Sequence, residues 1–382
     1  MRARRSILVL LGVLLLSASF VPAGAGSVPQ PSARRLKAAL RDLVDDPNGP
    51  RGAIVVIHRG SNRRVFTSGV ANVETGAAMR SDMHMRIAST SKAYSGGVAL
   101  SLVQQGALSL DDTVADLLPW APPDWGEVTL GQALHHTSGL PDYTADLGFL
   151  DYFADHLEDP LPPRQLLGYA GDELDFDAGT QYQYSNSDNI VVGLMVKAAT
   201  GRRYERELTM QVRKPLGLLH TSLPRGVEMP RPYIRGYQPP GNPPEDVSEL
   251  AAAGYAWASG GIVSTPGDQD RFVRGYIGRD LFDRTTQQAQ FDFIPGDSDP
   301  PGPGDNHAGL AVFRYSTSCG TMYGHTGSIF GYTQFIAASR DGRRSVVVSV
   351  NRQTTPTVAP AVFEKLQRVF RLGVCAAMSG SR

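Results

Sequence analysis

The sequence has 382 residues, of which 41% are hydrophobic and 19% are charged, and its formal net charge is zero. This composition excludes a disordered chain and is that of a globular protein, long enough for one large domain or two lobes. Because no net basic charge is present to attract polyanions, nucleic acid and anionic membranes are not expected partners.

The N-terminus has the pattern of a signal peptide. A basic start, "MRARR", precedes the apolar run "SILVLLGVLLLSASFV" and the small residues "AGA" at 23–25. The apolar run is too short for a stable membrane span. We therefore expect residues 1–25 to be removed by cleavage after Ala25, giving a secreted protein without a stable membrane anchor. Arg4-Arg5 leaves twin-arginine export open beside the ordinary secretory route.

The first part of the mature chain alternates helix and strand. Residues 26–37 are expected to form a leader, and "LKAALRDLVD" at 36–45 has helical periodicity. Residues 52–72 predict two β-strands around a polar turn that contains Gly60. A helix is expected over about 90–105, because apolar positions recur there at helical spacing.

The centre of the chain is predicted to be helical, and strands return toward the end. Residues 112–253 are expected to form a mainly helical lobe with long loops. "YGHTGS", "GYTQFIAASRDG" and "RRSVVVSVN" predict three antiparallel strands before a final helix, and 294–306 predicts an exposed Pro/Gly loop. The predicted fold class is therefore α/β: an antiparallel sheet flanked by helices, formed by 38–111 with 254–376, plus the helical lobe.

Ser89 and Lys92, in "RIASTSKAYSGG", lie three residues apart at the start of a predicted helix and so share one face. A serine hydroxyl is a poor nucleophile until a neighbouring group takes its proton. Lysine can do so only if burial or nearby positive charge lowers its pKa. The spacing alone is weak support for a nucleophile and its base. The assignment therefore depends on whether other segments of the chain supply the remaining catalytic groups.

Two such segments follow in order, "YSN" at 184–186 and "HTG" at 325–327. Together with Ser-x-x-Lys they match the three motifs of penicillin-recognising serine enzymes. Over residues 38–376 the chain resembles the serine β-lactamase and D-alanyl-D-alanine carboxypeptidase superfamily, in its Tyr-x-Asn branch. It is most similar to secreted actinobacterial D-Ala-D-Ala carboxypeptidases whose third motif is His-Thr-Gly. The resemblance implies a β-lactamase/transpeptidase-like fold.

The resemblance also implies roles for the first two motifs. Ser89 would attack the substrate carbonyl and carry the acyl group. Lys92 and Tyr184 would share the proton transfers, and which of them is the base stays open. Asn186 would bind the amide of the substrate and orient Lys92.

The third motif would lie on a strand edge beside the nucleophile. His325 is implied as a catalytic residue and Thr326 as a substrate-binding one, with Gly327 leaving room for the substrate backbone. The backbone N–H groups of Ser89 and Ser328 are the expected oxyanion hole.

Two further substrate contacts are less clearly implied. Carboxypeptidases need a cation for the terminal carboxylate of the substrate, but Phe313 stands where relatives have arginine. Arg314 follows one residue later, and adjacent strand residues point to opposite faces. A neutral His325 would also attract a carboxylate less than lysine does. Trp257 either lines the cleft or packs in the core.

The chain has two cysteines, Cys319 and Cys375, which also fit the subgroup it resembles. In an oxidising compartment a disulfide is expected rather than two free thiols, and it would stabilise the fold by roughly 3–4 kcal/mol. No metal site is expected, because the adjacent His135 and His136 have no further ligands at zinc spacing and are interpreted as structural. No cofactor is expected. The absence of G-x-S-x-G disfavours an α/β-hydrolase.

The sequence thus predicts a secreted, monomeric serine hydrolase acylated at Ser89 by penicillins. The leading hypothesis is a D-alanyl-D-alanine carboxypeptidase acting on peptidoglycan stem peptides. An esterase or D-amino-acid peptidase of the same fold is the alternative, with β-lactamase activity ranked lower. Outside enzymes, the fold would suit a non-catalytic β-lactam or cell-wall sensor. The expected partners are small peptide or ester substrates and β-lactams.

Overall fold

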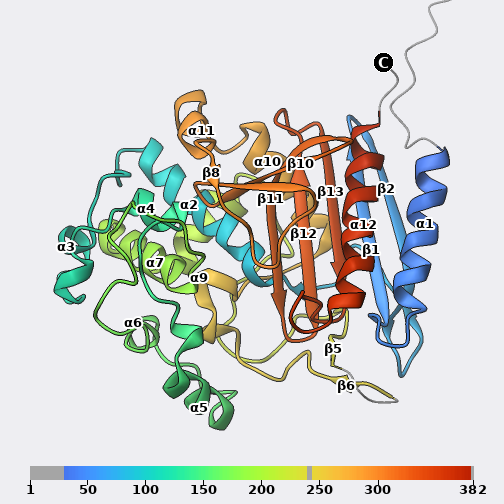
Figure 1. Ribbon diagram of the computed structural model, residues 1–382, viewed down its shortest axis with the longest axis horizontal. Helices are drawn as coiled ribbons and strands as arrows, with labels where there is room; N and C mark the ends of the chain where they lie inside the picture. The colour runs from blue at the N-terminus through green and yellow to red at the C-terminus, as the bar shows by residue number, and fades with distance from the viewer. Residues whose placement is uncertain (1–29, 239–242, 380–382) are drawn as a thin grey trace, which may run out of the picture.

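The computed structural model describes residues 30–238 and 243–379, and the predicted signal peptide lies outside them. At the centre of the described residues is a nine-stranded sheet, in which neighbouring strands are antiparallel (Figure 1). In order across the sheet, its strands are β3 (Ala77–Ala78), β2 (Asn62–Asn72), β1 (Gly52–Arg59), β13 (Arg344–Val350), β12 (Tyr332–Ala338), β11 (Gly320–Ile329), β10 (Val312–Thr317), β9 (Asp305–Gly309) and β8 (Ile294–Pro295).

The central strands are apolar on both faces because helices cover both sides of the sheet. Every residue of β12 is buried, and β1 and β13 each have a single partly exposed position. Val55 pairs with Val348 in the register of β1 and β13. Such uninterrupted runs of valine and isoleucine are expected where neither face meets water. The predicted strands within 52–72 and the three predicted near the C-terminus are all present.

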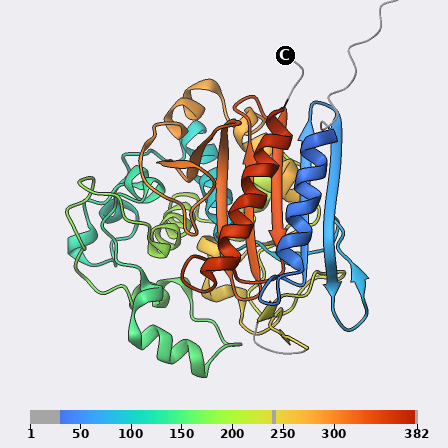
Figure 2. The same cartoon turned by 45° about the vertical axis from the view of Figure 1, so that its right-hand side comes forward.

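One face of the sheet is covered by the first and last helices, α1 (Gln30–Val44) and α12 (Pro360–Met378), which lie side by side (Figure 2). Leu36, Leu40 and Leu43 of α1 are fully buried against it, at the spacing of one helical face. The helix begins earlier than the predicted 36–45, because its first turn lacks the apolar periodicity on which that prediction depended.

The opposite face carries the remaining helices. Among these, α2 (Ser91–Gln104) is buried from its first residue to Leu102, so it lies at the centre of the molecule with no solvent-facing side. One continuous apolar core joins the sheet to this helical region; it includes Val56, Val98 and Val191. The other α-helices are α3 (Val114–Leu117), α4 (Leu130–His135), α5 (Leu147–Asp155), α6 (Pro163–Leu167), α7 (Asn186–Thr200), α8 (Tyr204–Glu207), α9 (Trp257–Gly260), α10 (Pro266–Gly278) and α11 (Arg284–Gln290).

Short elements connect these layers. Two small two-stranded sheets lie apart from the main one and are formed by β4 (Met85–Arg86) with β7 (Val263–Ser264) and by β5 (Tyr237–Gln238) with β6 (Glu245–Asp246). Tighter or wider helical turns occur at η1 (Ala88–Thr90), η2 (Pro123–Trp125), η3 (Tyr143–Ala145), η4 (Leu208–Arg213) and η5 (Ala253–Tyr255). The predicted fold class is confirmed, and the predicted boundary between two lobes stays a prediction. No described helix has the length and apolar character needed to span a bilayer.

The loop over 294–306 differs in part from its prediction. It was expected to be exposed, and residues such as Pro295, Asp297 and Gly304 are, but Ser298, Pro300 and Gly302 are buried. Gly302 packs so closely on Tyr315 of β10 that a Cβ there would lie 2.0 Å from the ring. The prediction missed the buried residues because proline and glycine were interpreted only as turn residues, whereas here they also allow close packing on the sheet.

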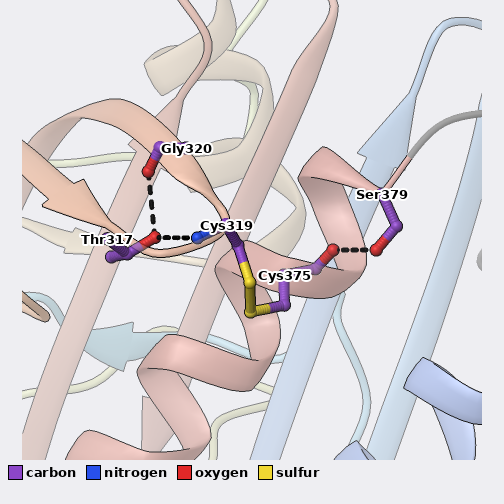
Figure 3. Close-up of a disulfide and its surroundings, with 5 residues drawn as sticks. All are labelled: Thr317, Cys319, Gly320, Cys375 and Ser379. Atoms are coloured by element: carbon purple, nitrogen blue, oxygen red, sulfur yellow. Dashed lines mark hydrogen bonds between the residues drawn. A yellow bond between two sulfur atoms is a disulfide. The ribbon is translucent and has the colours of Figure 1, made fainter. Parts of the chain in front are cut away.

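A disulfide joins Cys319, in the turn between β10 and β11, to Cys375 in α12 (Figure 3). Thr317 shapes the turn: its Oγ1 donates to the carbonyl of Gly320 and accepts from the amide of Cys319. The predicted pairing is present. The disulfide links α12 to the turn that precedes β11, the strand that carries the third motif.

Replacing both cysteines by serine is expected to lower the free energy of unfolding by about 3–4 kcal/mol, because the bridge closes a long loop in the unfolded chain. Urea denaturation of the purified double variant Cys319→Ser/Cys375→Ser measures this loss, with the reduced wild-type protein as control. An unchanged free energy of unfolding would show that the bridge contributes nothing.

Candidate active site

Ser89 is presented by a strained turn between β4 and α2. Ala88, the residue before it, has φ +51°, a left-handed conformation that residues with a side chain adopt at a cost. Ala88 is buried, and the Thr90 hydroxyl donates to the carbonyl of Ile87 across the same turn. The surrounding packing therefore holds Ser89 at the start of α2, on the wall of a cavity.

Lys92 lies fully buried one helical turn later, beside the Ser89 hydroxyl. Its Nζ donates to Ser89 Oγ at 3.2 Å, to Asn186 Oδ1 at 2.7 Å and to the carbonyl of Ser259 at 3.1 Å. Burial lowers the pKa of Lys92 to about 8, although nearby carboxylates led by Asp142 oppose the shift. A useful fraction of the amine is therefore neutral near neutral pH and positioned to accept the serine proton.

Tyr184 comes from the segment that leads into α7. Its ring centre lies 4.9 Å from Lys92 Nζ, and its hydroxyl is buried without a hydrogen-bond partner among the residues described. Burial raises the pKa of Tyr184 well above its usual value, and the nearby Ser89 hydroxyl opposes the shift. The phenol therefore stays protonated, which suits it to donate a proton rather than to accept one.

Asn186 is oriented by Asp142, which sequence reasoning did not single out. Asp142 Oδ2 accepts from the backbone amide of Asn186 at 3.1 Å and from its Nδ2 at 2.9 Å. The Asn186 amide nitrogen is thereby directed to Asp142 and its oxygen to Lys92. The only signal in the sequence was an aspartate after "SGLP", which is equally typical of a turn.

A buried polar group supports Tyr184 from behind. The ring of His136 packs on Tyr184 with centroids 4.5 Å apart, and its Nδ1 lies 2.7 Å from Asp188 Oδ2. Ser138 donates to the other oxygen of Asp188 at 2.5 Å. Burial lowers the pKa of His136 to about 3, so the ring is neutral. The structural interpretation of His136 fits this geometry, while Asp188 was missed because an aspartate inside an apolar helix gives no motif.

The third motif lies next to the nucleophile, but its first two side chains are buried and do not face the cavity. His325 and Thr326 are fully buried, and the Thr326 hydroxyl donates to the carbonyl of Pro300 in the 294–306 loop at 2.5 Å. Burial lowers the pKa of His325 to about 3, so its imidazole carries no charge. Neither residue is on the wall of the cavity described below, and their expected roles in substrate binding stay a prediction.

Gly327 explains how β11 can run so close to the nucleophile. A Cβ at this position would lie 2.8 Å from the backbone nitrogens of Ser89 and Thr90 and 2.8 Å from the carbonyl of Ile87. Only glycine permits this approach. The expected space at Gly327 is thus filled by the Ser89 turn, and the next residue, Ser328, lies on the cavity wall with Ser89. This places both residues of the expected oxyanion hole together.

The cavity above Ser89 has a volume of about 300 Å³. Of the residues on its wall, all of which belong to the described part of the chain, only Asp299 carries a charge. The wall consists of Ala88, Ser89, Tyr143, Thr144, Tyr184, Asn186, Ala256, Ser259, Gly260, Asp299, Ser328, Ile329, Gln353, Thr355, Thr357 and Val358.

Arg314 and Trp257 lie elsewhere. The guanidinium of Arg314 stacks on the ring of Phe293, 5.4 Å from its centre, and is not on the cavity wall. This follows from the register, since adjacent strand residues face opposite sides. The indole N–H of Trp257 donates to Glu205, and its ring packs against Tyr204. Of the two alternatives left open for Trp257, the structure favours packing in the core.

If Lys92 is the base, acylation should accelerate as pH rises through about 8, because the neutral amine is the reactive form. The measurement is the p-nitrophenol burst from a neutral p-nitrophenyl ester between pH 6 and 10. Lys92→Arg is expected to reduce the burst rate by about 10²-fold or more, because arginine cannot lose its proton. The exposed Lys197→Arg serves as control. A rate independent of pH across this range would contradict the assignment.

The chain is similar in sequence to a known protein family and to curated bacterial proteins. Residues 36–368 match the model of the family described as Beta-lactamase. "Protein flp" of Staphylococcus aureus (strain MRSA252) is 23% identical over 310 residues, which are 79% of this chain and 59% of the relative. "Penicillin-binding protein 4" of Amycolatopsis lactamdurans is 29% identical over 246 residues, 59% of each chain. The chain thus spans about 59% of the length of these curated relatives.

Solved structures share the fold. A D-stereospecific amidohydrolase from Streptomyces sp. is 28% identical with a TM-score of 0.75, covering 87% of this chain and 97% of the other. A D-amino acid amidase from Ochrobactrum anthropi SV3, at 21% identity and a TM-score of 0.76, covers 90% of this chain and 98% of the other and shows the fold alone. With the family model matched over most of its length, the chain belongs to the beta-lactamase family.

Proposed function

We propose that this serine acyl-enzyme hydrolase cleaves amides or esters of D-amino acids whose leaving group carries no carboxylate. The observation that carries the proposal is the closure of the third motif. Thr326 donates to Pro300, His325 is neutral and buried, and the cavity wall has no cation among the described residues. A substrate carboxylate would lose its hydration without finding a counter-ion, which is costly.

The catalytic cycle follows from the three side chains around the cavity. Neutral Lys92 takes the proton of Ser89, whose Oγ bonds to the substrate carbonyl carbon while the oxyanion is stabilised by the N–H groups of Ser89 and Ser328. The phenol of Tyr184 donates its proton to the leaving nitrogen or oxygen as that bond breaks. The proton held by Lys92 then restores Tyr184, and water hydrolyses the acyl ester on Ser89.

The solved relative of highest identity among those compared above supports this choice, since its printed description is a D-stereospecific amidohydrolase. The D-amino-acid peptidase and esterase alternatives predicted from the sequence belong to the same chemistry. Lys92 Nζ is hydrogen-bonded to Ser89 Oγ and lies 4.9 Å from the centre of the Tyr184 ring, and this grouping supports turnover over a purely non-catalytic sensor.

D-Alanyl-D-alanine carboxypeptidase activity on stem peptides is the second candidate, and the relative named penicillin-binding protein 4 favours it. It would require the 294–306 loop to release Thr326. Acylation of Ser89 by β-lactams fits the family and belongs to either candidate. A monomer remains our proposal for the assembly; the octameric penicillin-binding protein homologue from Pyrococcus abyssi, at 22% identity, shares the fold alone.

The two candidates differ in the substrate they prefer. With D-alanyl-D-alanine, its C-terminal amide and D-alanine methyl ester, kcat/KM is expected to be about tenfold or more higher for the amide and the ester than for the free acid, because an unpaired carboxylate is costly to bury. Ser89→Ala should abolish turnover and labelling by a fluorescent penicillin, whereas the exposed Ser61→Ala should not. Faster cleavage of the free acid would favour the carboxypeptidase.

We also propose that the protein is exported, which its N-terminal pattern and the Cys319–Cys375 disulfide support. Expression of the full sequence in an actinobacterial host is expected to yield protein in the medium that begins at Gly26, as determined by intact mass. Replacing Arg4-Arg5 by Lys-Lys should block export only if the twin-arginine route is used. Full-length protein retained in the cells would contradict the proposal.

A further inference from the structure

Asp299 is the charged side chain on the wall of the catalytic cavity, and the mechanism above does not use it. Its carboxylate makes no hydrogen bond or ion pair within residues 30–238 and 243–379. Desolvation raises the pKa of Asp299 and the charge of Lys92 opposes this shift without contact, while the Lys92 amine already donates to three other acceptors. The Asp299 carboxylate is therefore available to a molecule that enters the cavity.

The backbone around Asp299 is firmly held, which limits the positions that its short side chain can take. On one side, the Tyr182 hydroxyl donates to the carbonyl of Asp297 at 2.6 Å and the Tyr315 hydroxyl to Ser298 Oγ at 3.1 Å. On the other side, Pro300 accepts from the buried third-motif threonine, and the next carbonyl accepts from the side chain of a glutamine in α12. A charge fixed in this way binds with little ordering cost.

Asp299 is an exposed residue on the cavity wall, and a carboxylate on such a firmly held backbone attracts an ammonium group and repels another carboxylate. Asp142, the next carboxylate, has the same sign and is already hydrogen-bonded to Asn186. The charge on the described wall of the cavity is thus negative, which favours a cationic group of the substrate.

We propose that Asp299 is a specificity-determining residue that binds a free ammonium group of the acyl donor. This inference rests on the proposed function and narrows it: the substrates are D-amino-acid amides, or D-peptides, with an unblocked amino terminus. The competing explanation is that Asp299 only tunes Lys92 through space. That role would affect every substrate equally, whereas ammonium binding affects only substrates with a free amine.

The test compares D-phenylalanine p-nitroanilide with its N-acetyl derivative, which differs only in the blocked amine. Wild type is expected to favour the free amine by about 10- to 100-fold in kcat/KM, as for one charge-assisted hydrogen bond. Asp299→Asn should lower this ratio by about tenfold, and Asp297→Asn, two residues away and off the cavity wall, should leave it unchanged. Asp299→Lys should instead prefer the N-succinyl derivative, which carries a carboxylate.

Each remaining outcome is decisive. A wild-type enzyme that uses the acetylated and free substrates equally would overturn the role of Asp299 while leaving the proposed function intact. So would an Asp299→Asn variant that loses activity equally on both, which is the result expected from an effect on Lys92. If neither substrate acylates Ser89 in the wild type, as judged by intact mass, the proposed function fails and this inference fails with it.

Discussion

The burial of the Lys92 amine beside Ser89 is the constraint on which the site depends. A fully buried lysine is tolerated only if its Nζ finds acceptors or loses its proton, and this one does both in part. Its three acceptors come from the nucleophile, from the Asn186 side chain at the start of α7 and from the backbone of α9. One side chain therefore fixes the relative positions of three segments that are far apart in the sequence.

The charges around the cavity differ from those that the sequence motifs predict. The His-Thr-Gly segment is present on β11, but the 294–306 loop covers it and supplies the acceptor that Thr326 needs. Burial removes the charge of His325 and the strand register turns Arg314 away. Among the described residues, Asp299 is the charged one on the cavity wall. The motifs thus mark the place of the chemistry, and we propose that a neighbouring loop determines which substrates are accepted.

Much of this could be predicted from the sequence, because local patterns report local structure. The strands over 52–72, the helix after Ser89 and the disulfide followed from apolar periodicity and cysteine count. The partial burial of the 294–306 loop could not be predicted, because proline and glycine permit both a free turn and close packing. Asp188 and Asp299 were missed for a related reason: a single aspartate has no periodicity or spacing, and its role depends on contacts that only the tertiary fold creates.

The central claim is that Lys92 is neutral often enough to act as the base. Its ionisation can be followed directly by NMR titration of protein labelled with ¹³Cε-lysine, in which the Lys92 signal is identified by its loss in Lys92→Arg. The account predicts a transition near pH 8, far below that of an exposed lysine. A Lys92 signal that stays fully protonated up to pH 10 would contradict it.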